Sequence, residues 1–462
     1  MSLEKMRRRL PVVTSLPRSG SRKVLPLAPG ELHRPRLAVW EFTLACDQRC
    51  LHCGPRSTVR RPGELNTEEA LALVGELAAA GVGEVVLIGG EAYLRDDFIL
   101  VIRAIREAGM ACGITTGGYN LTPARAEAMA EAGVQSVSVS IDGLERSHDH
   151  VRGRPNSWRR AFQALANVRA VGIRAATNTQ VNQLTRTELV ALAELLAPAG
   201  VKAWQIQITV AHGNAADHPE LLLQPYMMEA LYGELERTLD RCDALGIAVW
   251  PANSVGYFGP LEHRLRARSG GHWGGCSAGT SVVGIESDGA IKSCPTLGGP
   301  SNTGGHWREH GLEAIWSRAP EIRYNGGRTL DDLWGYCREC YYAETCMAGC
   351  TAATEPLLGR PGNNPYCFHR AEELGRQGLR ERIEQVAPSG GQGFDNGLFR
   401  LIREWIDPAR RESEGPVSID EPRVSRLVEP SGPGRPVDVA AFTAEQDRTR
   451  RAAAGGDAEQ GP

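Results

Sequence analysis

The sequence predicts an α/β protein built as an open, partial (β/α)6 barrel of the TIM type. Three observations lead to this fold class. Short apolar runs recur between residues 37 and about 246, amphipathic helix patterns separate them, and only six such units occur where a closed barrel needs eight. The runs are LAVWEFT, EVVLIGG, MACGITT, SVSVSID, RAATNTQV and AWQIQITV. Alternating strands and helices favour a parallel sheet with right-handed crossovers, so we expect ligands at the carboxyl ends of the strands.

The first predicted helix illustrates the helical pattern. In NTEEALALVGELAAAG, Asn66 can cap the start and Gly81 can end the helix. One face carries Leu71, Val74, Leu77 and Ala78. Similar patterns predict helices at 97–108, 122–132, 158–171 and 186–199.

The chain divides into four segments by composition. Residues 1–35 are an irregular lead-in rich in Pro, Arg and Ser, and residues 36–250 form the predicted barrel. Residues 251–386 comprise a bridging segment and a Gly- and Cys-rich region, which ends in a helix predicted near 369–386. Residues 387–462 read as a mostly disordered tail. Its one exception is LFRLIREWI, where an apolar stripe predicts a short amphipathic helix that docks on the protein itself; the stripe is Leu398, Leu401, Ile402 and Trp405.

Charge and hydropathy exclude two classes of protein. The chain of 462 residues has 52 Lys and Arg against 55 Asp and Glu, a net charge of -3, which argues against nucleic-acid binding. No apolar run is long enough for a membrane span, and no signal peptide follows the basic MRRR near the N-terminus. We therefore expect a cytoplasmic protein with no nucleic-acid or membrane partner.

Twelve cysteines need a physical reason in a reducing compartment. Three lie near residue 50 and seven between 276 and 367, whereas Cys112 and Cys242 stand alone and fit ordinary burial. Clustered cysteines in such a compartment usually bind metal.

The first cluster has an unusual ligand count. Cys46, Cys50 and Cys53 are separated by three and two residues, and no fourth cysteine is near. Structural zinc is almost always four-coordinate, so a zinc site here would need a distant ligand. Three thiolates can instead hold three irons of a 4Fe–4S cube and leave the fourth iron free for a small molecule.

This spacing resembles the signature of the radical S-adenosylmethionine superfamily, and further motifs follow in family order. LIGGEAYLR resembles the Gly-Gly-Glu motif, with Gly89 and Gly90 beside the methionine amino group and Glu91 adding negative charge. SVSVSIDG and HDHVRG resemble later motifs, which imply that Ser140 contacts the cofactor and that Arg152 pairs with the methionine carboxylate. Gln207 is expected among the cofactor-binding residues on the same resemblance.

The resemblance also implies a partial six-unit barrel and a reaction. S-adenosylmethionine would bind the open iron of a 4Fe–4S cluster in the barrel. An electron from an external donor such as flavodoxin or ferredoxin would then lead to a 5′-deoxyadenosyl radical, which removes hydrogen from an unactivated carbon.

The second group of cysteines allows two interpretations. Four of them in YCRECYYAETCMAGC could hold one zinc. The whole arrangement instead resembles the SPASM extension of radical S-adenosylmethionine enzymes, which holds two auxiliary iron–sulfur clusters of the 4Fe–4S type. By position, the distal cluster would take Cys337, Cys340, Cys346 and Cys367, and the nearer one Cys276, Cys294 and Cys350. The nearer cluster is one ligand short, so either its iron is open to substrate or a side chain such as His272 or His263 closes it.

The resemblance makes a ribosomally made precursor peptide the expected substrate. Pro295 and Thr296 stand where sulfatase-maturating members carry an acidic base, which disfavours that reaction. With the first cysteine at 46 there is no room for an N-terminal leader-recognition domain, so a separate protein or another surface would recognise a leader, or none does. Oxidative carbon–carbon or carbon–heteroatom crosslinking is the expected reaction. The alternatives are another radical peptide modification such as epimerisation, excision or decarboxylation, a radical oxidoreductase acting on a small molecule, and a non-catalytic iron–sulfur scaffold.

Overall fold

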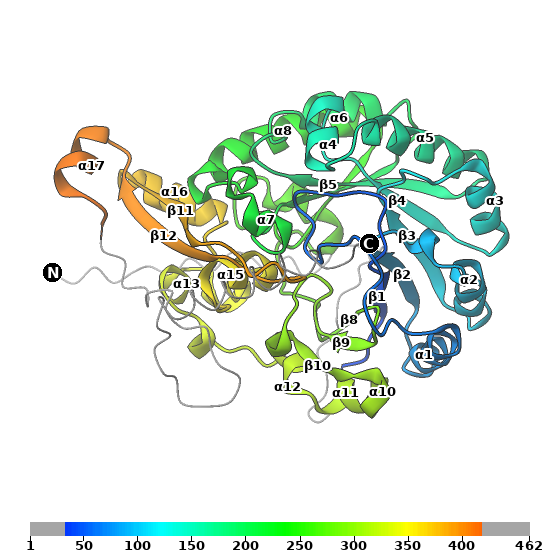
Figure 1. The fold of residues 1–462 in the computed structure, drawn as a ribbon. Coiled ribbons are helices and arrows are strands. Elements are labelled where there is room, and N and C mark those ends of the chain that lie inside the picture. Colours follow the sequence, from blue (N-terminus) through cyan, green and yellow to red (C-terminus); the bar gives the residue numbers. More distant parts are fainter. Residues whose placement is uncertain (1–32, 418–462) are drawn as a thin grey trace, which may run out of the picture.

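The computed structural model describes residues 33–417, and in it the barrel strands form one curved parallel sheet with helices on its outer side (Figure 1). Strand order is β10-β9-β8-β1-β2-β3-β4-β5-β6-β7. The six predicted strands are β1 Leu37–Thr43, β2 Glu84–Gly89, β3 Ala111–Thr116, β4 Ser136–Ser140, β5 Arg174–Val181 and β6 Ala203–Ile208. The partial barrel is confirmed. Most of the lead-in at 1–35 and the tail beyond 417 lie outside the described residues.

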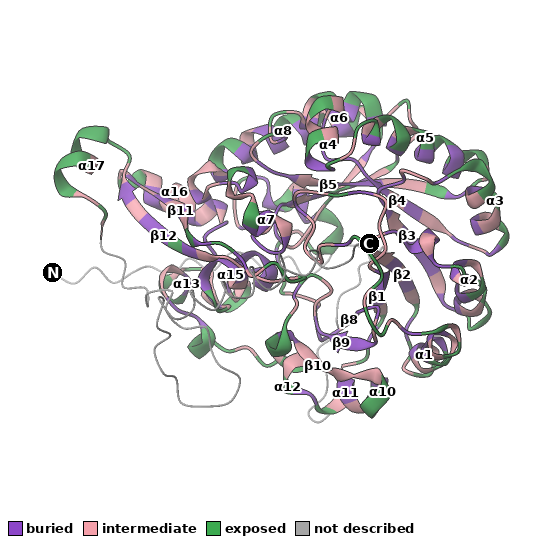
Figure 2. Cartoon of the chain, viewed as in Figure 1, coloured by how far each residue is buried: buried purple, intermediate pink, exposed green. Residues whose placement is uncertain are grey.

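Five helices match the sequence patterns closely: α1 Thr67–Ala79, α2 Phe98–Glu107, α3 Pro123–Glu131, α5 Ser157–Ala170 and α6 Leu189–Leu196. Three more were not predicted: α4 Glu145–Val151 between β4 and β5, and α7 Asn214–Asp217 and α8 Met228–Leu245 after β6. Asn66 caps α1 in a capping box with Glu69, which satisfies backbone donors of the first turn. The side of these helices that faces the sheet is buried, and their outer side is exposed (Figure 2). Removing that apolar surface from water is what stabilises the barrel.

The sheet extends beyond the six predicted strands. β7 (Ala248–Pro251) pairs with β6, and β8 (Val282–Ile285) pairs in parallel with β1, starting at Leu37 opposite Val282. β9 (Ala290–Lys292) and β10 (Thr303–His306) follow antiparallel. Because Cys276 precedes β8 and Cys294 follows β9, this pairing ties one end of the Cys-rich region to the first barrel strand.

Short helices fill the rest of the Cys-rich region. They are α9 Glu262–Leu265, α10 Trp307–His310, α11 Leu312–Arg318, α12 Pro320–Arg323, α13 Tyr336–Glu339, α14 Ala343–Cys346, α15 Thr351–Leu358 and α16 Phe368–Arg376. Most span a single turn and bury few side chains, as the sparse periodicity predicts. None of the helices within residues 33–417 is both long and apolar enough to cross a membrane.

The C-terminal part corrects three predictions, two helices and the start of the disordered tail. The segment predicted as an amphipathic helix is the strand β12 (Leu398–Trp405), and the helix predicted near 369–386 ends at Arg376 and gives way to β11 (Leu379–Ala387). The two strands pair antiparallel, with Ile383 opposite Leu401, so residues 387–417 are ordered and not a disordered tail.

The reason is cross-strand pairing, which the one-dimensional pattern does not reveal. Glu381 and Glu404, both buried, pair across the strands with Arg403 and Arg380 at 2.7 Å. Arg370 of α16 adds a bidentate contact to Glu381 at 2.6 and 2.8 Å. Opposite charges on facing strands stabilise a hairpin in place of the helix. The short α17 (Pro408–Glu414) follows.

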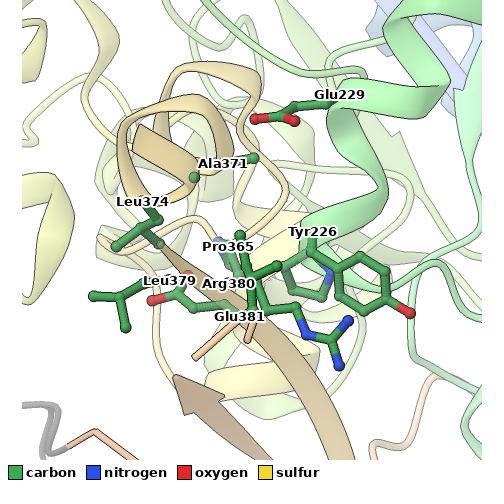
Figure 3. A pocket seen from close by; sticks show the side chains of 11 residues that line it. Tyr226, Glu229, Pro365, Ala371, Leu374, Leu379, Arg380 and Glu381 are labelled. Atoms are coloured by element: carbon green, nitrogen blue, oxygen red, sulfur yellow. The ribbon is translucent and has the colours of Figure 1, made fainter. Parts of the chain in front are cut away.

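A surface pocket of about 220 Å³ lies where this hairpin meets α16 and the short helix η3 (Pro225–Met227). Figure 3 shows Leu374, Tyr226 and Arg380 among its lining residues. The Arg380 guanidinium lies 4.8 Å from the centre of the Tyr226 ring. No cysteine lines this pocket, so it is distinct from the cysteine sites described next.

Candidate active site

The loop after β1 brings three thiols together at the carboxyl edge of the barrel. Burial raises the pKa of the Cys50 thiol to about 12, with contributions from Cys53 and Asp142 and an opposing one from Arg152. Burial and the neighbouring Glu91, Cys50 and Cys53 likewise raise the pKa of Cys46. Crowded thiols that resist ionisation alone become favourable ligands once a cation compensates their charge. The three side chains therefore fit a metal cluster.

Gly89 and Gly90 follow β2 and lie directly against this loop. A side-chain carbon on Gly89 would lie 2.3 Å from the Thr43 carbonyl oxygen, and one on Gly90 would lie 2.1 Å from that of Ala45. Gly89 also has φ +131°, a conformation that favours glycine. Hydrogen bonds from Gly90 N to Thr43 O (2.7 Å) and from Glu91 N to Ala45 O (2.8 Å) complete the contact. The glycines thus allow the Gly-Gly-Glu segment to pack on the cysteine loop.

The Glu91 side chain lies at the end of β3, where its carboxyl contacts the backbone. It is buried, accepts from the Gly117 backbone at 2.7 Å and contacts the Thr116 hydroxyl. Burial, reinforced by Asp47, raises the pKa of Glu91 to about 8. Ligand atoms of Cys46, Asp47 and Glu91 lie within 4.8 Å of one another. The carboxyl therefore favours the protonated form in the chain without bound groups.

Arg152 lies beside the cysteine loop within a buried polar network. Its Nη1 donates to Cys50 Sγ at 3.8 Å, and its Nε lies 2.8 Å from Asp142 Oδ2. His52 Nε2 lies 2.9 Å from the same oxygen. Burial opposes ionisation of Asp142, yet Arg152 and His52 hold its pKa well below its usual range. Sequence reasoning missed Asp142 and the role of His52, although Asp142 ends the SVSVSID run and His52 lies between two cysteines.

The remaining predicted cofactor residues lie on the inner face of the barrel. Ser140 Oγ accepts from Asn178 Nδ2 at 3.0 Å, and Ser138 donates to Asn178 Oδ1 at 3.0 Å. Gln207 pairs in register with Gln180 on β5. These polar residues alternate with fully buried ones that face the helices, such as Val139 and Trp204. Asn178 was not predicted, and only the alternation along RAATNTQV could have indicated it.

The seven cysteines of the extension separate into the two predicted groups. Cys337, Cys340, Cys346 and Cys367 line one small cavity with aromatic side chains, and the other three raise the pKa of Cys346 in addition to burial. Cys276 and Cys294 raise the pKa of Cys350 in the same way. None of the twelve cysteines forms a disulfide, and Cys112 and Cys242 are buried as expected. The two suggested histidines, His263 and His272, are both exposed, and His272 Nδ1 lies 2.9 Å from the Trp273 carbonyl oxygen.

The loop between β11 and β12 covers part of the cysteine loop, which the sequence did not predict. Phe394 N donates to Gly54 O at 2.8 Å, and Gly213 N donates to Asp395 O at 2.8 Å. The Phe394 ring lies between His212, at 5.7 Å, and the Lys292 ammonium, at 4.1 Å. Burial, with a contribution from Lys292, lowers the pKa of His212 to about 4, so this imidazole is neutral. The loop therefore joins the barrel edge to the strand that precedes Cys294.

Three thiols beside a glycine-lined contact at the carboxyl ends of parallel strands define a metal-cluster enzyme. A family model described as the radical SAM superfamily matches residues 40–196. The AdoMet-dependent heme synthase of Methanosarcina barkeri is 30% identical over 359 residues, covering 73% of this chain and 97% of that protein. The mycofactocin maturase MftC of Mycolicibacterium smegmatis is 27% identical over 399 residues, covering 84% and 96%.

A solved structure agrees on the fold. Streptococcus suis SuiB bound to S-adenosylmethionine superposes with a TM-score of 0.57 at 17% identity, covering 73% of this chain and 76% of that one. The chain belongs to the radical SAM superfamily, and its Cys-rich extension is of the SPASM type. It is a radical SAM enzyme.

Proposed function

We propose that this enzyme modifies a precursor peptide by oxidative carbon–carbon or carbon–heteroatom crosslinking. The observation that carries the proposal is the placement of a second cysteine set, Cys276, Cys294 and Cys350, at the edge of the barrel sheet through the pairing of β8 with β1. The similarity to MftC, a mycofactocin maturase by name, extends over 84% of the chain and supports the maturase class.

The chain's own residues supply binding and shielding. Cys46, Cys50 and Cys53 would hold the barrel 4Fe–4S cluster, and Arg152, already oriented by Asp142, would face the carboxylate of S-adenosylmethionine. When bound, the barrel cluster and S-adenosylmethionine together supply a 5′-deoxyadenosyl radical. Gly89, Gly90, Glu91, Ser140 and Gln207 would line the same cofactor site. The polar inner face of β4–β6 would orient the nucleoside, and the Phe394 loop would exclude water from it.

Crosslinking requires an electron acceptor. Forming one bond between two hydrogen-bearing atoms removes two hydrogens, one as a hydrogen atom and one as a proton with an electron. The set of Cys276, Cys294 and Cys350 is suited to hold the cluster that takes this electron, and Cys337, Cys340, Cys346 and Cys367 would hold a second cluster on the path outward. No acidic side chain follows Cys294, where Pro295 and Thr296 stand. A small electron donor such as flavodoxin or ferredoxin would supply the first electron, and a separate protein would present the leader if one is needed.

The proposal includes a cytoplasmic location, because an oxidising compartment would promote disulfides between cysteines that lie this close together.

The second candidate is oxidation of a small molecule of the heme-precursor class. The observation that favours it is the 30% identity to the heme synthase, the higher of the two similarities. Buried cations at the barrel edge suit a carboxylated substrate, but Lys292 is already paired with Glu286 at 2.7 Å, and Arg61 with Glu41 at 2.9 Å. Those pairs leave fewer cations available for substrate carboxylates, so we favour the peptide.

The test incubates the oxygen-free, iron-loaded enzyme with S-adenosylmethionine, dithionite and a candidate precursor peptide encoded beside its gene. A peptide mass lower by two hydrogens supports crosslinking. An unchanged mass with deuterium uptake from heavy water contradicts crosslinking in favour of epimerisation. A parallel reaction with a heme precursor tests the second candidate, and its conversion to heme with an untouched peptide would overturn the proposal.

A further inference from the structure

The nearer auxiliary site offers three thiols, although an iron–sulfur cluster of the 4Fe–4S type takes four protein ligands when closed. Cys276, Cys294 and Cys350 are the three. The two histidines suggested from the sequence are both exposed, whereas Cys350 is buried. A closed cluster therefore needs a fourth ligand from another element that reaches all three cysteines.

The segment after α12 meets that requirement. On the side of Cys276, Asn325 Nδ2 donates to the Ala278 carbonyl at 3.3 Å. The Ile322 carbonyl oxygen packs directly against Gly279, only 1.7 Å from the point where a side chain on that glycine would begin. Towards Cys350, Arg328 donates to Met347 O at 2.8 Å and to Thr351 Oγ1 at 2.7 Å. The chain from 322 to 328 thus spans from the residues after Cys276 to the residues on either side of Cys350.

Tyr324 lies in the middle of this segment. Its hydroxyl oxygen is buried and has no hydrogen bond of normal geometry. Burial raises the pKa of Tyr324, Cys294 and Cys276 raise it further, and the Thr351 hydroxyl opposes them. The Arg328 guanidinium lies 5.6 Å from the ring centre on the side of Thr351. The hydroxyl is therefore a buried polar atom near Cys276 and Cys294 with no hydrogen bond of normal geometry, and such an atom is costly unless a ligand or ion satisfies it.

Two other side chains compete for the role. The Asn253 amide donates to Cys276 Sγ at 3.9 Å, so its nitrogen faces the sulfur as a donor. Ser293 precedes Cys294 and also has a buried hydroxyl without a hydrogen bond. Its Cβ packs against Gly279, 3.2 Å from the point where a side chain on that glycine would begin. A phenol oxygen is a harder, more acidic ligand than a serine hydroxyl in general chemistry. Tyr324 is also connected to the Cys350 side of the site, because Arg328 lies over its ring and donates to the hydroxyl of Thr351.

We propose that the Tyr324 oxygen is the fourth ligand of the auxiliary cluster held by Cys276, Cys294 and Cys350. An iron–oxygen bond forms as the phenol proton leaves to solvent, and no oxidant or reductant is needed. The site is then closed, so this cluster transfers electrons and does not bind substrate. The inference rests on the proposed function only in taking this site to be an iron–sulfur cluster.

The test compares full-length variants loaded with ferrous iron and sulfide without oxygen, in a background with Cys46, Cys50 and Cys53 changed to Ala so that only auxiliary clusters remain. Tyr324→Phe is the test variant. The matched controls are Tyr336→Phe, which removes a hydroxyl beside the distal set, and Ser293→Ala. The readouts are iron per chain, the electron paramagnetic resonance spectrum, and resonance Raman bands of an iron-bound phenolate.

The proposal expects phenolate bands in the background protein and in both controls. It expects Tyr324→Phe to lose those bands and about one iron per chain, with a three-iron signal in the oxidised protein. Tyr324→Cys should restore the iron and give an all-thiolate spectrum, which shows that the site still folds.

Three results would overturn the inference. Equal iron and unchanged spectra in Tyr324→Phe, or loss of iron in Ser293→Ala alone, would remove Tyr324 from the ligand set. Added cyanide that shifts the spectrum of the background protein as much as that of Tyr324→Phe would show an iron already open. Zinc bound in place of iron in the background protein would overturn the assignment of this site as an iron–sulfur cluster, together with the role of Tyr324. This outcome distinguishes a failure of the cluster assignment from a failure of the Tyr324 assignment alone.

Discussion

Arg56 Nη2 lies 3.0 Å from Asp395 Oδ1, although 339 residues separate them in the chain. Arg56 follows the third cysteine of the barrel loop, with φ +54°, and also donates to the Ser389 hydroxyl at 2.7 Å and to the Gly213 carbonyl at 2.9 Å. This one guanidinium therefore joins the cysteine loop, the end of β6 and the C-terminal hairpin loop.

Removing that side chain should release the hairpin loop. Arg56→Ala leaves the Asp395 and Asp217 carboxylates without their shared cation, and we expect a cost of about 2 to 4 kcal/mol. Hydrogen exchange measured by mass spectrometry should then accelerate in residues 388–397. Arg60→Ala is the control, because its guanidinium is largely exposed and its nearest carboxylate is 3.9 Å away. Equal exchange in the two variants would contradict the role of Arg56.

The barrel cysteines should be indispensable for cofactor cleavage. Changing Cys46, Cys50 or Cys53 to Ala removes one of three thiolate ligands, so formation of 5′-deoxyadenosine from S-adenosylmethionine and dithionite should fall to background. Chromatography of the nucleoside products measures this. Cys112→Ala, which removes a buried free thiol from β3, should retain the activity. Persistent cleavage in Cys53→Ala would refute the ligand assignment.

The distal set should matter for turnover and not for cleavage. Cys340→Ala removes a thiol from the cavity shared with Cys337, Cys346 and Cys367, away from the barrel loop. We expect this variant to keep some uncoupled 5′-deoxyadenosine formation while peptide product disappears. Both products are measured in one reaction, and their ratio is the readout. A parallel loss of both would mean that the extension is needed for the barrel to fold.

Glu41 should make stability depend on pH. Burial, with a smaller contribution from Glu286, raises the pKa of this β1 carboxyl from 4.5 to about 7 against the opposing Arg61. Because the folded pKa exceeds the unfolded one, the associated stability is complete below pH 4.5 and is lost as pH rises through 7. Over that window the loss is up to about 3 kcal/mol.

Glu41→Gln should remove this dependence. Thermal unfolding of the variant and the unvaried chain at pH 5 and pH 8 measures it, and the variant should lose less stability on going to pH 8. Glu236→Gln, an exposed position on α8, is the control. Identical pH dependence in Glu41→Gln and the unvaried chain would contradict the assignment.

Much of the architecture was predictable because its determinants are local. The helix predicted at 97–108 is α2 at Phe98–Glu107, and the Asn66 cap is present as predicted. Motif order along the chain placed Gly89, Gly90 and Arg152 beside the cysteine loop, where the structure has them. The hairpin was missed because LFRLIREW satisfies a helical stripe equally well until β11 supplies a partner.

By itself the sequence determined the six strand–helix units and the two groups of clustered cysteines, because periodicity and spacing are properties of the chain alone. The class of enzyme and the division of the second group into two sets came from the resemblance of its motifs to a known family. Only the tertiary structure decided what surrounds those ligands. The Asp142–Arg152 pair, the Arg56 contact and the position of Tyr324 all join residues from separate elements. Burial and charge act over a few ångströms in space, and folding alone brings those distant residues that close.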